Sequence, residues 1–497
     1  MTATQTTEDH VDLANPHHDR RWLILALLGT AQLMVVLDAT VVNIALPSAQ
    51  NALRFSDANR QWVVTAYSLT FGSLLLLFGR FGDLFGRKRT LMIGLVAFGV
   101  VSAIGGAAQS FGMLVTARAF QGAAGALLAP SALSLLTTTF SEPRERGIAF
   151  GIYGAIAGAG GAVGLLLGGV LTEYLSWRWC LYVNVAIAVP AVFAAFVLLT
   201  NQVPATRPRL DVPGAVAVSL GLFLIVYGFS QAEPRGWTDW ETLGSLIAGV
   251  IILAVFVVIE RQAAHPLLPL RIVLDRNRGG SYLSVLISGA GLFGVFLFLT
   301  YYLQKTLLYS PVVTGLAFLP MVAMIIIGST TSNAVLLPRF GPKPLVPTGM
   351  LLAALGMVIL AQLGVHSSYA ADILPALLVT GLGLGLIFAP SINTATLGVG
   401  QEDAGVASAT VNSCQQVGGS IGTAFLNTIA TTAVTSYLAG KALTPLVSAQ
   451  AAVHGYTVAF WWAAGIFLLG ALVSGTLLRP GTALATAGEA QPAPVAA

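Results

Sequence analysis

The sequence predicts an all-α polytopic membrane protein, built from two parallel six-helix repeats with an inserted two-helix hairpin between them. Three observations predict this fold class: the chain is strongly apolar, long apolar runs recur along it, and the second half repeats motifs of the first. Of the 497 residues, 56% are hydrophobic and only 9% are charged, whereas a soluble domain carries about a quarter charged residues. We therefore expect a protein that lies in a lipid bilayer and has essentially no soluble domain.

Fourteen apolar segments are long enough to cross ~30 Å of hydrocarbon as helices. We place them at residues 22–46, 61–79, 90–108, 111–136, 147–172, 179–199, 213–229, 242–259, 279–303, 313–334, 345–364, 372–397, 404–429 and 455–478. Residues 1–21 carry four acidic residues and no apolar core, so we interpret them as a cytoplasmic N-terminal tail and not as a signal peptide. The Pro- and Ala-rich residues 479–497 are predicted to be a disordered cytoplasmic tail.

The distribution of positive charge predicts the orientation. If the N-terminus is cytoplasmic, most of the 24 Lys and Arg residues fall in loops on the inside, as the positive-inside rule requires. A shift by one span would destroy this asymmetry, so we expect both termini in the cytoplasm. The net charge of +4 belongs to these loops and gives no reason to expect a nucleic-acid partner.

An internal repeat divides the spans into two sets. Phe85-Gly86-Arg87-Lys88 recurs as Phe340-Gly341-Pro342-Lys343, and Ala129-Pro130-Ser131 recurs later as Ala389-Pro390-Ser391, at nearly the same offset. Two parallel six-helix repeats are the arrangement of the halves of the major facilitator fold, where the substrate path runs between them. The architecture therefore favours a transporter.

The repeat also gives the predicted domain organisation. The N-terminal half covers residues 22–199 and the C-terminal half covers residues 279–478. Between them, residues 200–278 form a linker that contains the inserted helices 7 and 8. The hairpin spans contain no charge, which suggests a peripheral role.

Residues 79–89 form the most highly charged short stretch between two spans. Its glycines allow a tight turn, and its single acid, Asp83, can meet an arginine or a helix N-terminus in one conformation and leave it in another. We predict a conformational switch loop formed by Gly79, Asp83, Gly86, Arg87, Lys88 and Arg89. The alternative is that the basic residues only hold this loop in the cytoplasm.

Two charges lie well inside predicted spans, Asp38 in the first and Arg118 in the fourth. Counted along the helices at 1.5 Å per residue, they lie ~24 Å and ~10 Å from opposite membrane surfaces, at comparable depth. They can therefore face each other. One interpretation is a permanent ion pair that fixes two helices; the other is a carboxylate that alternately holds a proton, Arg118 or a cationic substrate.

Other polar residues are predicted to line a cavity, and glycines of the fifth span are predicted to form a moving surface. Asn412, Gln415 and Gln416 share one face of the thirteenth span, and amides facing lipid are costly. The predicted cavity-lining residues are Asn43, Tyr67, Gln121, Tyr301, Asn412, Gln415 and Gln416. The glycines of the fifth span, which include Gly160, Gly164, Gly168 and Gly169, allow close helix packing and are predicted to form a moving surface.

Motifs for other chemistry do not occur in the sequence. There is no phosphate-binding glycine loop followed by Lys-Ser or Lys-Thr, and no metal-binding His-Glu-x-x-His or Cys-pair motif. We expect no cofactor and no enzymatic activity, with the proton-motive force as the energy source. The two cysteines are interpreted as packing residues.

Over residues 20–480 the chain resembles the fourteen-span drug/proton antiporter branch of the major facilitator superfamily, the EmrB/QacA type. The matching motifs are the loop at 79–89, the span-1 motif at 37–47, the span-4 motif at 118–122, and the span-5 antiporter motif at 160–169 with Trp177-Arg178-Trp179 and Asn184 after it. The resemblance implies that Arg118 takes part in proton coupling. The chain departs from the family pattern at Leu165 and Ala186, where prolines are usual, and at Leu84.

These observations predict a proton-coupled exporter of lipophilic or cationic drugs in the cytoplasmic membrane. Its partners are a small-molecule substrate, protons and the lipid bilayer, and we expect a monomer. In this hypothesis Asp38 carries the proton or meets the substrate cation, while Asp83 with Arg87–Arg89 stabilises the outward-open state. The alternatives are a proton-coupled metabolite importer and a non-transporting membrane regulator on the same fold.

Overall fold

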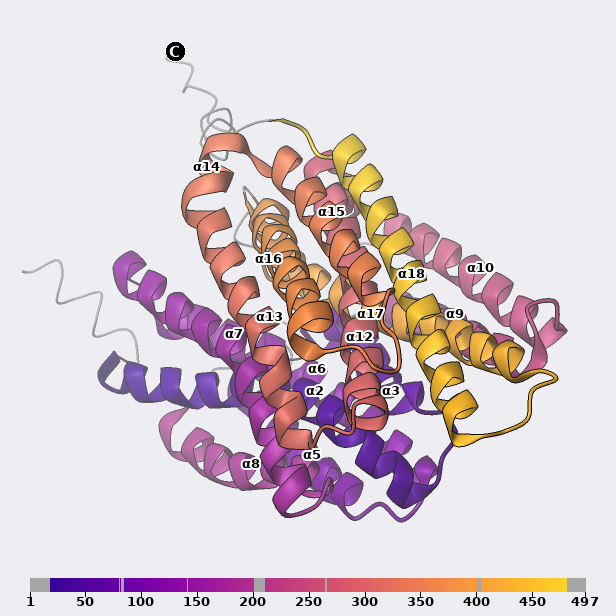
Figure 1. Cartoon of the computed structure of the whole chain (residues 1–497). Helices are drawn as coiled ribbons and strands as arrows, with labels where there is room; N and C mark the ends of the chain where they lie inside the picture. The colour runs from indigo at the N-terminus through magenta and orange to yellow at the C-terminus, as the bar shows by residue number, and fades with distance from the viewer. Residues whose placement is uncertain are drawn as a thin grey trace, which may run out of the picture.

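In a computed structural model, the chain folds into a bundle of long helices (Figure 1). The structure describes residues 18–79, 81, 85–140, 142–200, 211–263, 266–397, 399 and 404–480, and contains no strand among them. The long helices are α2 (Arg21–Leu53), α3 (Gln61–Gly79), α5 (Arg87–Gly106), α6 (Phe111–Thr139), α7 (Pro143–Tyr174), α8 (Trp179–Leu198), α9 (Val212–Arg235), α10 (Trp240–Gln262), α12 (Arg276–Tyr301), α13 (Pro311–Thr331), α15 (Pro342–Leu360), α16 (Leu374–Thr396), α17 (Ala404–Leu438) and α18 (Pro445–Leu477).

Eleven helical segments among the described residues are long and apolar enough to cross a membrane. The prediction of an all-helical, multi-pass membrane protein is therefore confirmed. The three other long helices, α3, α7 and α17, pack among these segments.

The two halves repeat the same helix pairs, as the sequence repeat predicts. In the first half α2 packs on α7, α3 on α6, and α5 on α6 and α8; in the second half α12 packs on α17, α13 on α16, and α15 on α16 and α18. The repeated Phe-Gly motif has the same backbone role in both halves. Gly86 and Gly341 have φ of 91° and 72° and precede the first residues of α5 and α15. A side chain is unfavourable at such a φ, so glycine is needed at both turns.

The halves meet along two helix pairs, α3 with α17 and α7 with α13. We call the end of the bundle that holds Arg21, Lys88 and Arg276 the basic end, and the opposite end, with loops 54–60 and 302–310, the Arg60 end. Polar contacts between the halves gather at the Arg60 end. They join Tyr301 to Gln50, Gln304 to the Ile44 carbonyl, Lys305 to Asn51, Arg60 to Asn427 and the Val312 amide to Glu173.

Helices α9 and α10 pack on each other at one flank of the bundle, where α9 also contacts α17 and α3 (Figure 1). The predicted linker residues 201–210 lie outside the described residues. Both helices extend past the predicted spans. The extension of α10 places the buried Glu260 in a helix whose predicted span carried no charge.

Several helices differ from the predicted spans at their ends. α17 continues to Leu438 and α18 begins at Pro445, because polar residues can continue a helix beyond the apolar run that defines a span. Short π-helical turns follow α12 and α13 at Tyr302–Thr306 and Ser332–Leu336 and precede α16 at Tyr369–Ile373; hydrophobic periodicity does not predict them. α7 runs without a break through Leu165, where the proline of the antiporter motif would remove a backbone hydrogen bond.

The contact between α7 and α13 leads to a first prediction. A Cβ at Gly169 would lie 2.7 Å from the Pro311 carbonyl oxygen and 2.8 Å from the Val312 Cα. Gly169→Val should therefore separate the halves at the Arg60 end. The overpacking should destabilise the closed state by ~1–3 kcal/mol, which lowers the population closed at this end on the order of tenfold. The measurement is bismaleimide crosslinking between Asn51→Cys and Lys305→Cys in a background that lacks Cys180 and Cys414.

The matched control for this prediction is Gly161→Val on the same helix. A Cβ there would meet nothing within 4 Å, so its crosslinking yield should equal that of the parent protein. Equal yields for both valine variants would contradict the close approach at Gly169.

Candidate functional site

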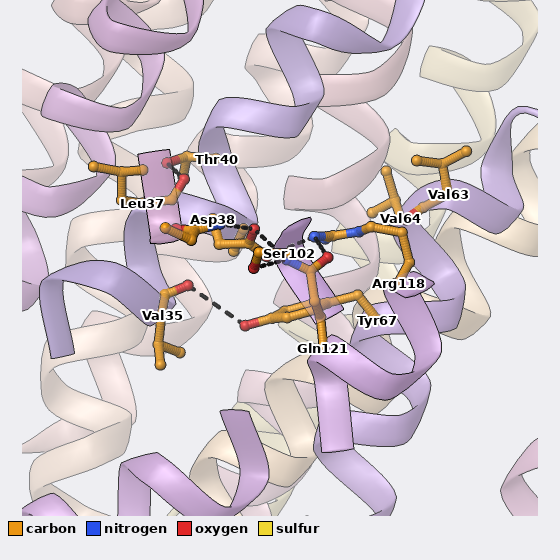
Figure 2. Close-up of polar contacts among 12 residues, drawn as sticks. Val35, Leu37, Asp38, Thr40, Val63, Val64, Tyr67, Ser102, Arg118 and Gln121 are labelled. Atoms are coloured by element: carbon orange, nitrogen blue, oxygen red, sulfur yellow. Dashed lines mark hydrogen bonds and ion pairs between the residues drawn. The ribbon is translucent and has the colours of Figure 1, made fainter. Parts of the chain in front are cut away.

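A cluster of buried polar side chains lies inside the N-terminal half (Figure 2). Five helices contribute to it: α2, α3, α5, α6 and α8. The side chains are Asp38, Tyr67, Ser102, Arg118, Gln121 and Asn184, each with a relative exposure of 1% or less. Their mutual hydrogen bonds determine what the cluster can do.

Asp38 accepts hydrogen bonds from three side chains. Arg118 Nη1 lies 2.5 Å from Asp38 Oδ2 and forms an ion pair with it. The other carboxylate oxygen, Oδ1, accepts from Asn184 Nδ2 at 2.7 Å and from Gln121 Nε2 at 3.1 Å. Three donors directed at one carboxylate compensate for its burial.

Arg118 is held on the other side by backbone and ring contacts. Its Nε donates to the Val63 carbonyl of α3 at 3.0 Å, and its Nη1 also donates to Gln121 Oε1 at 3.0 Å. The guanidinium carbon lies 4.4 Å from the centroid of the Tyr67 ring, within the range of a cation–π contact. The charge is thus neutralised by Asp38 and fixed in position by α3.

Further contacts lie on both sides of the Asp38–Arg118 pair, and both side chains are almost fully buried. On the basic-end side, Gln121 donates to Ser102 Oγ at 2.7 Å, and the Tyr67 hydroxyl lies 3.4 Å from the Val35 carbonyl oxygen. On the Arg60-end side, a small hollow borders Arg118, and every other residue that lines it is apolar: Val42, Ala45, Leu46, Ala49, Val63, Leu114, Trp177, Cys180 and Leu181. Proton exchange at Asp38 therefore requires a rearrangement.

The family assignment comes from sequence comparison. Residues 28–423 match the profile of the Major Facilitator Superfamily, which covers more than half of the chain. The chain belongs to the major facilitator superfamily. The ion pair between Asp38 and Arg118 therefore lies deep inside one half of a protein with a transporter fold.

Relatives in this superfamily carry names that refer to antibiotics. The puromycin resistance protein of Streptomyces alboniger is 50% identical over 461 residues, which cover 92% of each chain. The cephamycin export protein of Amycolatopsis lactamdurans is 41% identical over 408 residues, covering 82% of this chain and 84% of the relative. The tetracenomycin C resistance and export protein of Streptomyces glaucescens is 36% identical over 412 residues, covering 82% and 76%.

Solved structures support the fold. The inward-facing, occupied structure of a bacterial homologue of the human lysosomal transporter Spinster has a TM-score of 0.65 over 96% of this chain and 99% of its own. The sequence identity is 15%, so the likeness shows the superfamily fold alone.

The glycines of α7 pack against the helix that carries Asp38. Cβ atoms at Gly160 and Gly168 would lie 3.1 Å from Val36 and 2.9 Å from the Val41 carbonyl oxygen, and Gly164 would clash with Thr40. Glycine at these positions lets α7 approach α2 closely. This face packs closely on α2 in the structure; its role as a moving surface stays a prediction.

Only part of the predicted switch loop lies within the described residues, because Asp83 is outside them. Gly79 lies against Pro130, and Gly86 precedes α5. Lys88 donates to the carbonyls of Phe196 and Leu199 at 2.8 and 2.5 Å and thus binds the C-terminal end of α8. Arg89 is exposed to solvent, and Arg87 interacts with another group of the protein. The role of Asp83 in the outward-open state stays a prediction.

The predicted cavity-lining residues separate into three groups. Tyr67 and Gln121 belong to the buried cluster, while Asn43 donates to the Ala39 carbonyl of its own helix. Tyr301 is 2% exposed and lies at the Arg60 end, in contact with Gln50, so it does not line an open cavity in this conformation. On α17, Asn412 is exposed, and Gln415 and Gln416 are half-buried, with Gln416 next to Gly72 of α3.

Asn184 and Ser102 are members of the site that the sequence does not predict. Asn184 belongs to the motif after the fifth span, and a lone asparagine in an apolar span is itself a signal of a buried hydrogen bond. Ser102 carries no such signal, because serine is common in membrane helices. Arg60 lies in the predicted loop between the first two spans, yet it is 3% exposed and buried between the halves.

The ion pair leads to a second prediction, on stability. Asp38→Leu or Arg118→Met alone leaves one buried charge without its partner and should lower the free energy of unfolding by about 3–5 kcal/mol. The double variant Asp38→Leu/Arg118→Met should lose clearly less than the sum. The measurement is a double-mutant cycle of unfolding in detergent micelles.

A surface ion pair in the same chain provides the control. Arg235 and Glu241 lie 2.7 Å apart with side-chain exposures of 45% and 25%, and the corresponding cycle should give a coupling of about 0–1 kcal/mol. If losses at Asp38 and Arg118 simply add, the two groups are not coupled and the pair does not stabilise the fold.

Proposed function

We propose that the chain is a proton-coupled exporter of antibiotic-like, lipophilic or cationic small molecules. The observation that carries the proposal is the buried Asp38–Arg118 pair, held at 2.5 Å within one half of a transporter fold. A charge in a membrane helix costs ~3 kcal/mol or more and usually serves a function. The names of the relatives support the substrate class.

The cluster supplies a proton carrier whose state depends on conformation. In the arrangement described here, the Asp38 carboxylate forms an ion pair with Arg118 and accepts hydrogen bonds from Asn184 and Gln121. If α2 moves relative to α6 and α8, these three donors are withdrawn together. A buried carboxylate without donors is costly, so Asp38 then takes up a proton. Its return to the cluster releases that proton.

The conformation described here corresponds to an inward-facing state. The polar contacts between the halves lie at the Arg60 end, where Tyr301, Lys305 and Arg60 each bind the other half. If the basic end faces the cytoplasm, as the positive-inside rule predicts, the outer end is closed and the substrate arrives from inside. Ionised Asp38 then belongs to the state that has released its proton and accepts a substrate.

We further propose that α3, α7 and α17 also cross the bilayer, which gives fourteen spans with both termini in the cytoplasm. The lengths of these helices are 19, 32 and 35 residues, enough for ~30 Å of hydrocarbon. With α9 and α10 as an inserted hairpin, this is the arrangement of the EmrB/QacA branch. The proton-motive force supplies ~2.3 kcal/mol per charge per 100 mV, and no cofactor is needed.

The second candidate function is a proton-coupled importer on the same fold. α7 lacks the proline of the antiporter motif and runs unbroken through Leu165, so the motif does not fix the direction. Transport assays from both faces separate the two functions.

The test uses inside-out membrane vesicles with an acidic lumen. Puromycin, tetraphenylphosphonium or a neutral antibiotic is added to the bath, which faces the cytoplasmic side, and proton release is followed with a lumenal pH dye. We expect at least one compound to trigger release in the wild type, and Asp38→Asn to lose this response, because an amide cannot carry the proton.

Glu241→Gln is the control, since it removes a carboxylate from the exposed pair with Arg235 and should leave proton release unchanged. Release only when the substrate is loaded into the lumen would favour the importer. Proton release that persists in Asp38→Asn would show that Asp38 has only a structural role as the partner of Arg118.

A further inference from the structure

A second buried cation lies between the halves, at the Arg60 end. Arg60 directly precedes α3 and is 3% exposed. Its guanidinium carbon lies 4.4 Å from the ring centroid of Tyr301, 5.5 Å from that of Phe298 and 5.9 Å from that of Tyr456. All three distances fall within the range of cation–π contacts. We call these three rings the aromatic cage.

Polar partners compensate this charge only in part. Arg60 Nε donates to the neutral side chain of Asn427 at 2.9 Å. The carboxylate of Asp57 lies 3.7 Å from Arg60 Nη1, and its side chain is 62% exposed, so solvent screens the pair. The π faces of the cage therefore contribute a large share of the stabilisation of the buried guanidinium.

The cage and the cation belong to different halves. Tyr301 and Phe298 lie on α12 and Tyr456 lies on α18, whereas Arg60 belongs to the N-terminal half. Separation of the halves at this end withdraws Arg60 and leaves the three rings without a cation. Tyr302 and Phe460 continue the aromatic wall, with ring centroids 6.4 Å from those of Tyr456 and Phe298 respectively.

We propose that the aromatic cage is an organic-cation site of the C-terminal half, which Arg60 occupies while the Arg60 end is closed. When that end opens, a lipophilic organic cation binds the rings in place of Arg60. On closing, Arg60 returns to the cage and displaces the cation. The assignment of this cation as a departing substrate rests on the proposed export function, but the existence of the site does not.

The test is occupation of the cage by a free cation after removal of the arginine. Purified Arg60→Ala is titrated with ethylguanidinium, and the thermal unfolding midpoint is followed. We expect ethylguanidinium at millimolar concentration to raise the midpoint of Arg60→Ala and not that of the wild type, where the cage is filled. Ethylurea, which has the same shape without the charge, should have no effect.

The double variant Arg60→Ala/Tyr301→Leu removes the nearest ring and should lose the response. The variant also tests substrate chemistry: tetraphenylphosphonium should bind Arg60→Ala about tenfold more tightly than the double variant, in line with the strength of a desolvated cation–π contact, and ethylguanidinium should compete. An equal response to ethylurea, or an equal response in the double variant, would overturn the site.

A second measurement keeps the wild-type Arg60 and thus does not depend on the folding of Arg60→Ala. Tyr301 also donates to Gln50 at 2.5 Å, so Tyr301→Phe removes this hydrogen bond but keeps the ring, while Tyr301→Leu removes both. We expect crosslinking between Asn51→Cys and Lys305→Cys to fall several-fold further in Tyr301→Leu than in Tyr301→Phe. Equal losses would show that the ring does not hold Arg60.

These experiments test the export function and the organic-cation site separately. Proton release in vesicles with no ethylguanidinium response in folded Arg60→Ala would leave the exporter standing without this site. A selective ethylguanidinium response with no transport would leave a cation site in a protein of another function.

Discussion

The buried carboxylate of Asp38 is the constraint on which the N-terminal half depends. It lies in an apolar bundle with no exposure to solvent. It must therefore form an ion pair, accept hydrogen bonds or be protonated. Arg118, Asn184 and Gln121 satisfy it from α6 and α8, so the positions of three helices are tied to one ionisation state. In the proposed mechanism a change of protonation changes which helix arrangement is stable, and this coupling is what a secondary transporter needs.

Two kinds of contact connect this cluster with the rest of the molecule. The glycines of α7 bring that helix against α2 on one side and, at Gly169, against α13 of the other half. Close backbone packing of α7 thus links the helix that carries Asp38 with the contact between the halves. At the Arg60 end the halves are joined by polar and cation–π contacts, which water can replace when they separate. The contacts between the halves are thus of two kinds, a close helix packing at Gly169 and exchangeable polar and cation–π contacts beside it.

The sequence predicted the helical bundle, the repeat and the depth of the ion pair, because each depends on periodicity along one chain. Asp38 and Arg118 could be placed at the same depth by counting residues from the helix ends. The partners Asn184 and Ser102 could not, because the angular positions of α8 and α5 are set by tertiary packing. Arg60 shows the same limit: a short polar loop gives no sign that its last residue is buried among aromatic rings of the other half. Helix ends were misplaced where polar residues continue the helix, as in α17 and α18.

The central claim is that Asp38 is ionised in the closed cluster and protonated when the cluster opens. Infrared difference spectroscopy on the purified protein, with pH lowered in the presence and absence of Gly169→Val, measures this directly. The account predicts a C=O band of a protonated carboxyl that is enhanced by Gly169→Val, which favours opening at the Arg60 end, and that is absent in Asp38→Asn. A band that persists in Asp38→Asn, or no carboxyl band that depends on conformation, would contradict it.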